Sequence, residues 1–292
     1  MSFSLQFVLV LIGTFMIALV LTPLVRLFSF KIDAVDYPNA RRINTKPMPS
    51  AGGLSIVIAF SIATLVFIPM LTSTTAPIKS YLSYTLPVVG AGWIIALTGL
   101  IDDVKELSAK KKMIGILLAA SLVWFLTDFR LNDFKIPFGG PLLHFEPWLS
   151  YLLTVIWIVA ITNAVNLIDG LDGLVSGVSI ISLVTMGIVS YFFLPVPNLF
   201  LTMTIFVLVA SIAGFFPFNY HPAILYLGDT GALFIGFMIS VLSLQGLKNA
   251  TAVAVVTPMI ILGVPITDTF LAIIRRTLSG QKFYKQIGRA HV

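Results

Sequence analysis

The longest uncharged stretch of the chain, residues 174–228, constrains the fold most, because it contains no Asp, Glu, Lys or Arg. A transmembrane helix needs about 20 consecutive apolar residues, so this stretch can hold two, with the Pro-Val-Pro-Asn segment at 195–198 as the turn between them. Across the chain 58% of residues are hydrophobic and 10% are charged, whereas about a quarter are charged in soluble domains. We therefore predict an all-α, polytopic transmembrane helical bundle.

Apolar segments of similar length recur along the whole chain, and we expect one integral membrane domain over residues 1–292. The nine spans that we predict are Leu5–Phe28, Gly52–Leu71, Leu86–Leu100, Met113–Leu126, Leu149–Val165, Leu174–Leu194, Leu199–Phe216, Leu227–Leu244 and Ala252–Ile274. The first span is not a cleaved signal peptide, because it lacks a basic region before it and is too long.

The charged residues orient these spans. If the spans alternate, fourteen of the 18 Lys and Arg residues lie on one side of the membrane, and four lie on the other. Cytoplasmic loops carry the excess of Lys and Arg, which places the N-terminus outside and the loops around Asp36, Asp102, Asp169, His221 and Arg275 inside. Nine of the twelve carboxylates fall on the same cytoplasmic face. Acids and bases are therefore expected to gather at one membrane surface.

Two adjacent carboxylates, Asp102 and Asp103, follow directly on an apolar run and precede the basic run at residues 110–112. Their mutual repulsion favours a bound cation or a shared proton. The alternative is that the pair only anchors a helix end at the membrane surface.

A second polar group ends another hydrophobic segment, in the run Asn163–Gly173. Asn163, Asn166 and Asp169 are spaced three apart, which puts them near one helix face, and Asp172 follows between glycines. Burying so many polar groups without partners would cost several kcal/mol. The alternative is a Gly-rich turn between helices.

The segment Tyr226–Gly231 places Asp229 at the cytoplasmic start of a span, where an ordinary helix-capping role would also suit it. Together with the four aspartates described above it makes five carboxylates on one face, in a chain without cysteine. Oxygen ligands suit Mg²⁺, or Mn²⁺, better than zinc.

The first cytoplasmic loop, Asp36–Gly53, combines prolines, basic residues and a Gly-Gly pair. Its Arg and Lys side chains can meet phosphates, and the glycines allow close backbone approach. The alternative is a solvated loop that only obeys the positive-inside rule.

These motifs, in this order, resemble the polyprenyl-phosphate N-acetylhexosamine-1-phosphate transferase family. The resemblance rests on D-x-P-N with P-x-P and GG at Asp36–Gly53, G-L-I-D-D at Gly99–Asp103, N-A-x-N-L-I-D-G-L-D-G at Asn163–Gly173, G-D-T-G at Gly228–Gly231, and P-I-x-D with R-R at Pro265–Arg276. Asp268 followed by Arg275-Arg276 is similar to the branch that uses UDP-N-acetylglucosamine (UDP-GlcNAc).

The resemblance implies transfer of GlcNAc-1-phosphate from UDP-GlcNAc to undecaprenyl phosphate, with release of UMP, as the first membrane step of a cell-envelope glycan such as teichoic acid or O-antigen lipopolysaccharide. It further implies Mg²⁺, a bacterial plasma membrane, no nucleic-acid partner and a possible homodimer. The roles expected by resemblance are catalysis by Asp102, Asp103 and Asp169, metal binding by Asp229 and Asp103, and substrate binding by Asn163, Asn166, Asp172, Tyr226, Lys46, Arg41, Arg42, Arg275 and Arg276.

The chain departs from the family pattern in two places. Asn44 stands where members of this branch usually carry His. The chain also stops before a His-rich cytoplasmic motif, and its last six residues, Ile287–Val292, match the translation of a common sequencing adapter. We therefore expect residues 287–292 to be non-native, His291 to have no catalytic meaning, and the native protein to continue.

Three other functions remain as alternatives. One is the peptidoglycan branch of the same family, which uses UDP-MurNAc-pentapeptide. Another is a cation-coupled transporter, although transporters usually bind near the bilayer midplane and between repeated halves, and no repeat is visible here. The last, a membrane scaffold, would leave the five clustered carboxylates without a purpose.

Overall fold

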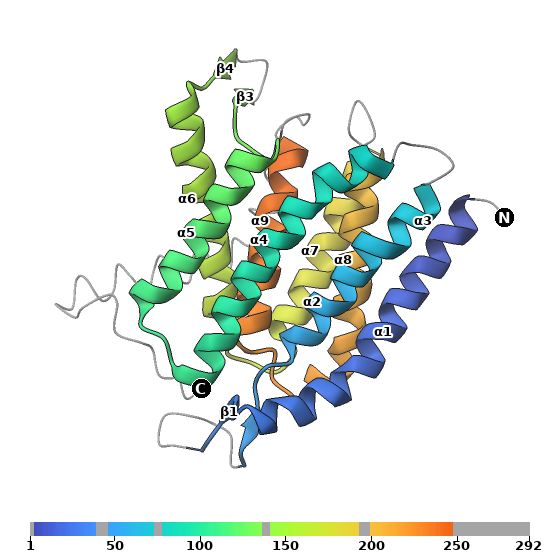
Figure 1. Ribbon diagram of the computed structural model, residues 1–292, viewed down its shortest axis with the longest axis vertical. Coiled ribbons are helices and arrows are strands. Elements are labelled where there is room, and N and C mark those ends of the chain that lie inside the picture. Colours follow the sequence, from blue (N-terminus) through green and yellow to red (C-terminus); the bar gives the residue numbers. More distant parts are fainter. Residues whose placement is uncertain (1–2, 39–45, 73–77, 136–140, 193–198, 248–292) are drawn as a thin grey trace.

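The computed structural model describes residues 3–38, 46–72, 78–135, 141–192 and 199–247, and within them the chain is a bundle of helices (Figure 1). The elements are α1 (Phe3–Lys31), β1 (Val35–Asp36), β2 (Met48–Pro49), α2 (Gly53–Ile62), the π-helical turn η1 (Ala63–Phe67), α3 (Ile68–Thr72), α4 (Ile78–Lys105), α5 (Ala109–Leu126), β3 (Asp133–Lys135), β4 (Leu142–His144), α6 (Pro147–Ile168), α7 (Leu174–Phe192), α8 (Leu199–Asn219) and α9 (Gly228–Leu247).

The predicted transmembrane bundle is confirmed. Six helical runs are long and apolar enough to cross a membrane, and the shorter run Gly228–Leu244 in α9 is also apolar. The predicted span Met113–Leu126 lies in α5, whose first turn carries three lysines. The last predicted span, Ala252–Ile274, lies outside the described residues. The chain is thus a multi-pass membrane protein.

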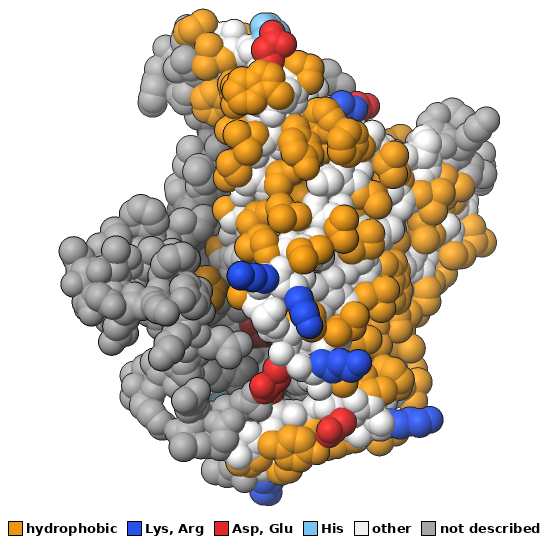
Figure 2. Space-filling model, turned by 60° about the vertical axis from the view of Figure 1, so that its left-hand side comes forward, with side chains coloured by type: hydrophobic (Ala, Val, Ile, Leu, Met, Phe, Trp, Pro, Cys, Tyr) orange, Lys and Arg blue, Asp and Glu red, His pale blue; other side chains and the backbone are white. Residues whose placement is uncertain are grey.

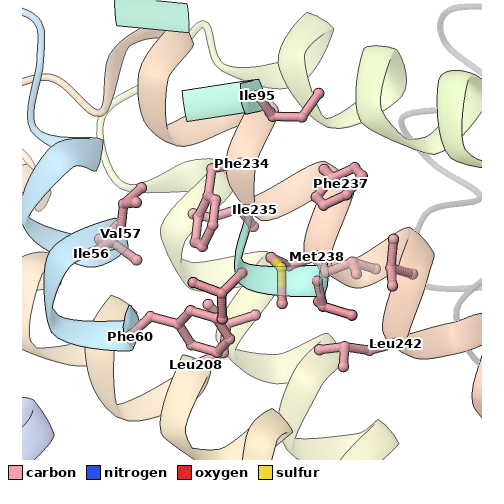
Figure 3. Packing of buried hydrophobic residues seen from close by; sticks show 14 of the residues in the cluster. Ile56, Val57, Phe60, Ile95, Leu208, Phe234, Ile235, Phe237, Met238 and Leu242 are labelled. Carbon is pink, nitrogen blue, oxygen red and sulfur yellow. The ribbon is translucent and has the colours of Figure 1, made fainter. Parts of the chain in front are cut away.

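Helix α9 forms the centre of the bundle. Every residue from Thr230 to Leu244 is buried, as expected for a helix that is hydrophobic on all sides. It packs between α4, α6 and α2. Figure 3 shows Phe234 of α9 facing Phe60 of α2, and their rings meet edge to face with centroids 5.8 Å apart. This packing holds the first turn of α9 at one end of the bundle.

The outer helices expose large apolar side chains, for example Leu24 on α1, Leu118 on α5, Ile156 on α6 and Ile181 on α7. Figure 2 shows a broad hydrophobic surface, with most of the visible Lys and Arg side chains in the lower half of the view. An apolar surface of this extent suits contact with lipid.

Several chain segments meet at the end of the bundle drawn lowest in Figure 1, which we call the charged end. It contains the end of α1, the antiparallel pair β1 and β2, the end of α4, the start of α5 and the start of α9. The opposite end carries the antiparallel hairpin of β3 and β4. The motifs gather at one end, as predicted, because they lie at helix termini and the helices cross the whole bundle.

Candidate active site at the charged end

Asp229, in the first turn of α9, lies at the centre of a polar cluster. The Asn166 side-chain amide at the end of α6 donates a hydrogen bond to its Oδ1. Lys112 of α5 donates from Nζ to its Oδ2 at 3.0 Å. Three helices, distant in the sequence, thus bring their polar ends to one carboxylate.

Asp103 holds the start of α9. Its Oδ1 accepts from the Asp229 backbone N–H at 2.8 Å, and its Oδ2 accepts from the Thr230 N–H at 3.0 Å and the Thr230 hydroxyl at 2.5 Å. A carboxylate at a helix N-terminus satisfies N–H groups that lack helical partners and suits the helix dipole. Because Asp103 makes these three bonds to the first turn of α9, its contacts favour a positioning role.

Asp102 points to different partners. It is buried, its Oδ1 accepts from the Leu107 backbone N–H, and its Oδ2 contacts the Lys112 ammonium. Asp102 and Asp229 lie close together, because both carboxylates contact the same Lys112 ammonium. Adjacent residues on a helix point about 100° apart because of the helical repeat. Asp103 therefore contacts the start of α9, whereas Asp102 contacts Lys112.

Two glycines allow these elements to approach each other closely. A Cβ atom on Gly53 of α2 would lie 2.1 Å from the Cα atom of Gly231 in α9. Gly228 has a φ of +71°, and a Cβ there would lie 1.6 Å from the Ser50 carbonyl oxygen. Real Cβ atoms cannot occupy such positions, so both glycines set the place of Asp229 in the bundle.

The first loop is tied to the segment before α9 by backbone hydrogen bonds. The Tyr226 N–H donates to the Pro49 carbonyl at 2.9 Å, and the Gly52 and Gly53 N–H groups donate to the carbonyls of Tyr226 and Leu227 at 3.0 and 2.9 Å. Tyr226 is half-buried and Lys46 is exposed. The predicted Gly-Gly pair thus fastens this loop beside Asp229.

At the start of that loop, the Tyr37 hydroxyl donates to Asp33 at 2.8 Å, and this hydrogen bond raises the pKa of Tyr37.

A second polar cluster joins the α6–α7 turn to the α8–α9 loop. Asp172 Oδ2 accepts from the Ala223 backbone N–H at 3.1 Å and lies 3.0 Å from the His221 Nδ1 atom. Nearby, Ser176 donates to Asn219 at 2.9 Å. Asp172 therefore fixes the loop that leads to Tyr226 and Asp229.

The structure brings Asp102, Asp103, Asn166 and Asp229 together, as the motifs predicted. The Asn163 side chain donates to the Val159 carbonyl of its own helix at 2.8 Å. Asp169 is half-buried just after α6. The remaining candidates, Arg41, Arg42, Arg275 and Arg276, lie outside the described residues, as do Asn44, Asp268 and His291.

Three residues of these clusters were not singled out from the sequence: Lys112, Thr230 and His221. Lys112 is the last of three consecutive lysines, and only its contacts separate it from Lys110 and Lys111, which are exposed. A periodicity argument could have selected it, because Lys112 shares a helix face with the buried residues Gly115, Ile116 and Ala119 of α5.

The carboxylate oxygens of this cluster are of the kind that a hard divalent cation could use. Within the described ranges, no three His, Cys, Asp or Glu side chains are arranged to hold a metal ion. Mg²⁺, however, is often bound by only one or two carboxylates, together with waters and substrate phosphates. Asp229 and Asp102, which lie close together and share Lys112, meet that smaller requirement.

Comparison with known proteins places the chain in a family. The model of glycosyl transferase family 4 matches residues 85–247, which include the ends of α4, α5, α6 and α9 that form the site.

The curated relatives have related names. The "Probable undecaprenyl-phosphate N-acetylglucosaminyl 1-phosphate transferase" of Bacillus subtilis is 42% identical over 278 residues, which cover 94% of this chain and 73% of the relative. The decaprenyl-phosphate N-acetylglucosaminephosphotransferase of Mycolicibacterium smegmatis is 32% identical, covering 88% and 67%. The phospho-N-acetylmuramoyl-pentapeptide-transferase of Staphylococcus saprophyticus is 33% identical, covering 82% and 74%.

The region matched by the family model contains the Asp-Asp pair, Lys112, Asn166 and Asp229. The polar cluster around Asp229 therefore lies within the family match. The resemblance predicted from the motifs is confirmed, and the chain belongs to glycosyl transferase family 4.

Proposed function

We propose that the protein transfers GlcNAc-1-phosphate from UDP-GlcNAc to undecaprenyl phosphate. The observation that carries this proposal is the cluster of Asp102, Lys112, Asn166 and Asp229 at one end of a membrane bundle. It is supported by the 42% identity to the Bacillus subtilis protein, whose name states this reaction. The peptidoglycan-branch relative is 33% identical, so the GlcNAc donor is favoured.

The reaction joins two anions. An oxygen of the lipid phosphate attacks the sugar-side phosphorus of UDP-GlcNAc, the bond from that phosphorus to the bridging oxygen breaks, and UMP leaves with the bond electrons. The lipid phosphate is largely dianionic near neutral pH, so it needs little help from a base. Phosphoryl transfer depends mainly on positioning and on offsetting negative charge.

The residues of the cluster divide these tasks. Asp229 and Asp102 would hold Mg²⁺, which supplies positive charge to the phosphates when it is bound. Asn166 orients Asp229, and Asp103 holds the first turn of α9 in place. Asp102 lies where it can also orient the lipid phosphate. Asp103 therefore serves as a positioning residue in this proposal.

The donor would lie beside this cluster, along the loop that Asp172 fastens. Tyr226 offers an aromatic face for uracil, and Asn163, Asp169 and Asp172 follow along the α6–α7 segment. Lys46 is exposed on the first loop, where it can reach a phosphate. Arg41, Arg42, Arg275 and Arg276 remain predicted contacts of the pyrophosphate.

The membrane setting supports a cytoplasmic active site. Among the described residues, every Asp and Glu lies in a loop or strand, or in the last or first turn of a helix. This arrangement suits soluble UDP-GlcNAc meeting a lipid phosphate at the interface. A coupled transporter would instead need ionisable groups near the midplane. On the positive-inside rule we propose that this end lies in the cytoplasm and the N-terminus outside.

In the cell this reaction would begin a teichoic acid, an O-antigen lipopolysaccharide or a related envelope glycan.

A double-label assay in detergent tests the proposal. UDP-GlcNAc carrying ³²P in its sugar-side phosphate and ¹⁴C in the sugar is incubated with undecaprenyl phosphate, Mg²⁺ and the purified protein. Both labels should move to the organic phase in a one-to-one ratio, with one UMP released for each. Chelation of Mg²⁺ with EDTA should stop the transfer, and added Mn²⁺ should restore part of it.

Each alternative gives a different result. Transfer of ¹⁴C without ³²P would indicate an ordinary glycosyl transfer with UDP as the leaving group. Transfer from UDP-MurNAc-pentapeptide and not from UDP-GlcNAc would indicate that the chain belongs to the peptidoglycan branch. No transfer from either donor, in an assay where the Bacillus subtilis relative works, would contradict the proposed activity.

A further inference from the structure

Lys112 differs from its two lysine neighbours. Lys110 and Lys111 are exposed, whereas only 16% of the Lys112 side chain is accessible. Its Nζ atom contacts Asp102 Oδ2 and lies 3.0 Å from Asp229 Oδ2. One ammonium therefore bridges two carboxylates that belong to different helices.

The Lys112 ammonium and a divalent cation would neutralise the same two carboxylates. A cation held by Asp102 and Asp229 would therefore compete with Lys112 for their oxygens. Two cations cannot share these oxygens at contact distance without strong repulsion, because the site is partly shielded from water. Binding of one should therefore oppose binding of the other.

Building on the proposed Mg²⁺ role, we propose that Lys112 is the resident counter-ion of the Asp102–Asp229 pair, and that a divalent cation must displace its ammonium in order to bind. The ammonium keeps the two carboxylates neutralised while no metal is bound. An acidic site without it would repel both anionic substrates. The displaced ammonium also becomes free to meet an anion that arrives with the metal.

Direct measurement of Mn²⁺ binding tests this exchange without any turnover. The chain contains no cysteine, so Lys112→Cys introduces a single thiol into purified protein in detergent. The amount of free Mn²⁺ is followed by electron paramagnetic resonance. Couplings between bound groups are typically 5- to 150-fold in affinity, so Lys112→Cys should bind Mn²⁺ at least about fivefold more tightly than the parent chain.

Chemical modification of the same thiol restores or withholds the charge. Alkylation with 2-bromoethylamine rebuilds a lysine-like ammonium and should return Mn²⁺ affinity toward that of the parent chain. Alkylation with iodoacetamide adds a neutral group and should leave the affinity high. Lys112→Arg keeps the charge and should bind Mn²⁺ with about the affinity of the parent chain. If Lys112→Cys does not fold, Lys112→Met is used in its place.

Lys111→Cys is the matched control, because it removes the same charge from the neighbouring exposed position. It should change Mn²⁺ affinity by less than about twofold, as expected for a screened surface charge, before and after either alkylation. Asp229→Asn should abolish tight Mn²⁺ binding.

The outcomes separate this inference from the proposed function. Equal or weaker Mn²⁺ binding by Lys112→Cys and its iodoacetamide adduct, or by Lys112→Met in their place, beside normal binding by the parent chain, would overturn the exchange and leave the metal role intact. Unchanged binding in Asp229→Asn, or no binding by the parent chain, would overturn the metal role itself and the exchange with it.

Discussion

The two ends of the bundle use charge differently. At the charged end, Asp102, Lys112 and Asp229 come from α4, α5 and α9, and their side chains are 7%, 16% and 31% accessible. At the opposite end, the pairs Asp133–His144 and Asp128–Arg130 join residues close in the sequence. There His144 is 73% accessible and Asp128 is 82% accessible.

This difference separates charge that serves a site from charge that covers a surface. Shielded ion pairs often lose as much energy in desolvation as they gain from attraction, so stability alone does not explain the cluster around Asp229. Exposed pairs contribute about 0–1 kcal/mol and need no further explanation. We infer that the charged end is built for chemistry and that the hairpin end is not.

Loss of charge at Asp102 should have the largest effect among the changes around Asp229. Asp102→Asn keeps the shape of the side chain but removes one charge from the pair that Lys112 bridges. We expect transfer of label to fall about 100-fold, because the change weakens one of the two carboxylates proposed to hold Mg²⁺, and loss of one charge-stabilising group typically costs about 100- to 1,000-fold. The rate of ³²P transfer at saturating Mg²⁺ measures it, and a near-normal rate would remove Asp102 from the mechanism.

Close packing at the charged end gives the next effect. Gly53→Ala would force its Cβ against the α9 backbone at Gly231, and overpacking of this kind costs about 1–3 kcal/mol. The Tm in detergent should fall, and transfer should fall with it because Asp229 moves. Gly90→Ala is the control, since a Cβ at Gly90 meets nothing within 4 Å. Equal Tm values for the two variants would contradict the packing argument.

The donor site should show a smaller and selective effect. Tyr226→Ala removes the aromatic face beside Asp229 and should weaken binding of UDP-GlcNAc by about tenfold, since stacking on a base contributes about 1–3 kcal/mol. Equilibrium dialysis with labelled donor gives this number. The KM for undecaprenyl phosphate should stay unchanged, and an effect confined to the lipid would refute the stacking role.

The smallest effect belongs to the hairpin end. Asp133→Asn breaks an exposed pair with His144 and should change transfer by less than about twofold and stability by less than about 1 kcal/mol. The same double-label assay and a Tm in detergent measure both. A large loss of transfer would show that the two ends do not differ in the way described above.

Sequence reasoning predicted the bundle and the end at which the site lies, because hydropathy is a local property and helix length fixes where each motif emerges. The same reasoning selected Asp102, Asp103, Asn166 and Asp229, which the structure brings together, but it did not predict which partner each side chain contacts. That Asp103 holds α9 while Asp102 meets Lys112 depends on how α4, α5 and α9 rotate against one another. Packing between helices that are far apart in the sequence decides such contacts, and a local sequence pattern does not predict this packing.

The His221–Asp172 contact illustrates the same point for loops. The aspartate was predicted as a substrate contact, and the structure gives it the Ala223 backbone and His221 as partners. These partners are far from Asp172 in the sequence, and only the fold of the α8–α9 loop brings them near.

The rate of Mg²⁺-dependent transfer in Asp229→Asn, measured beside Asp133→Asn in the double-label assay, tests most directly whether the cluster at the charged end is the active site. We predict that Asp229→Asn lowers ³²P transfer by about 1,000-fold, in the range seen when one group that stabilises transition-state charge is removed, while Asp133→Asn stays near the parent rate. Equal rates in the two variants would contradict an active site at Asp229.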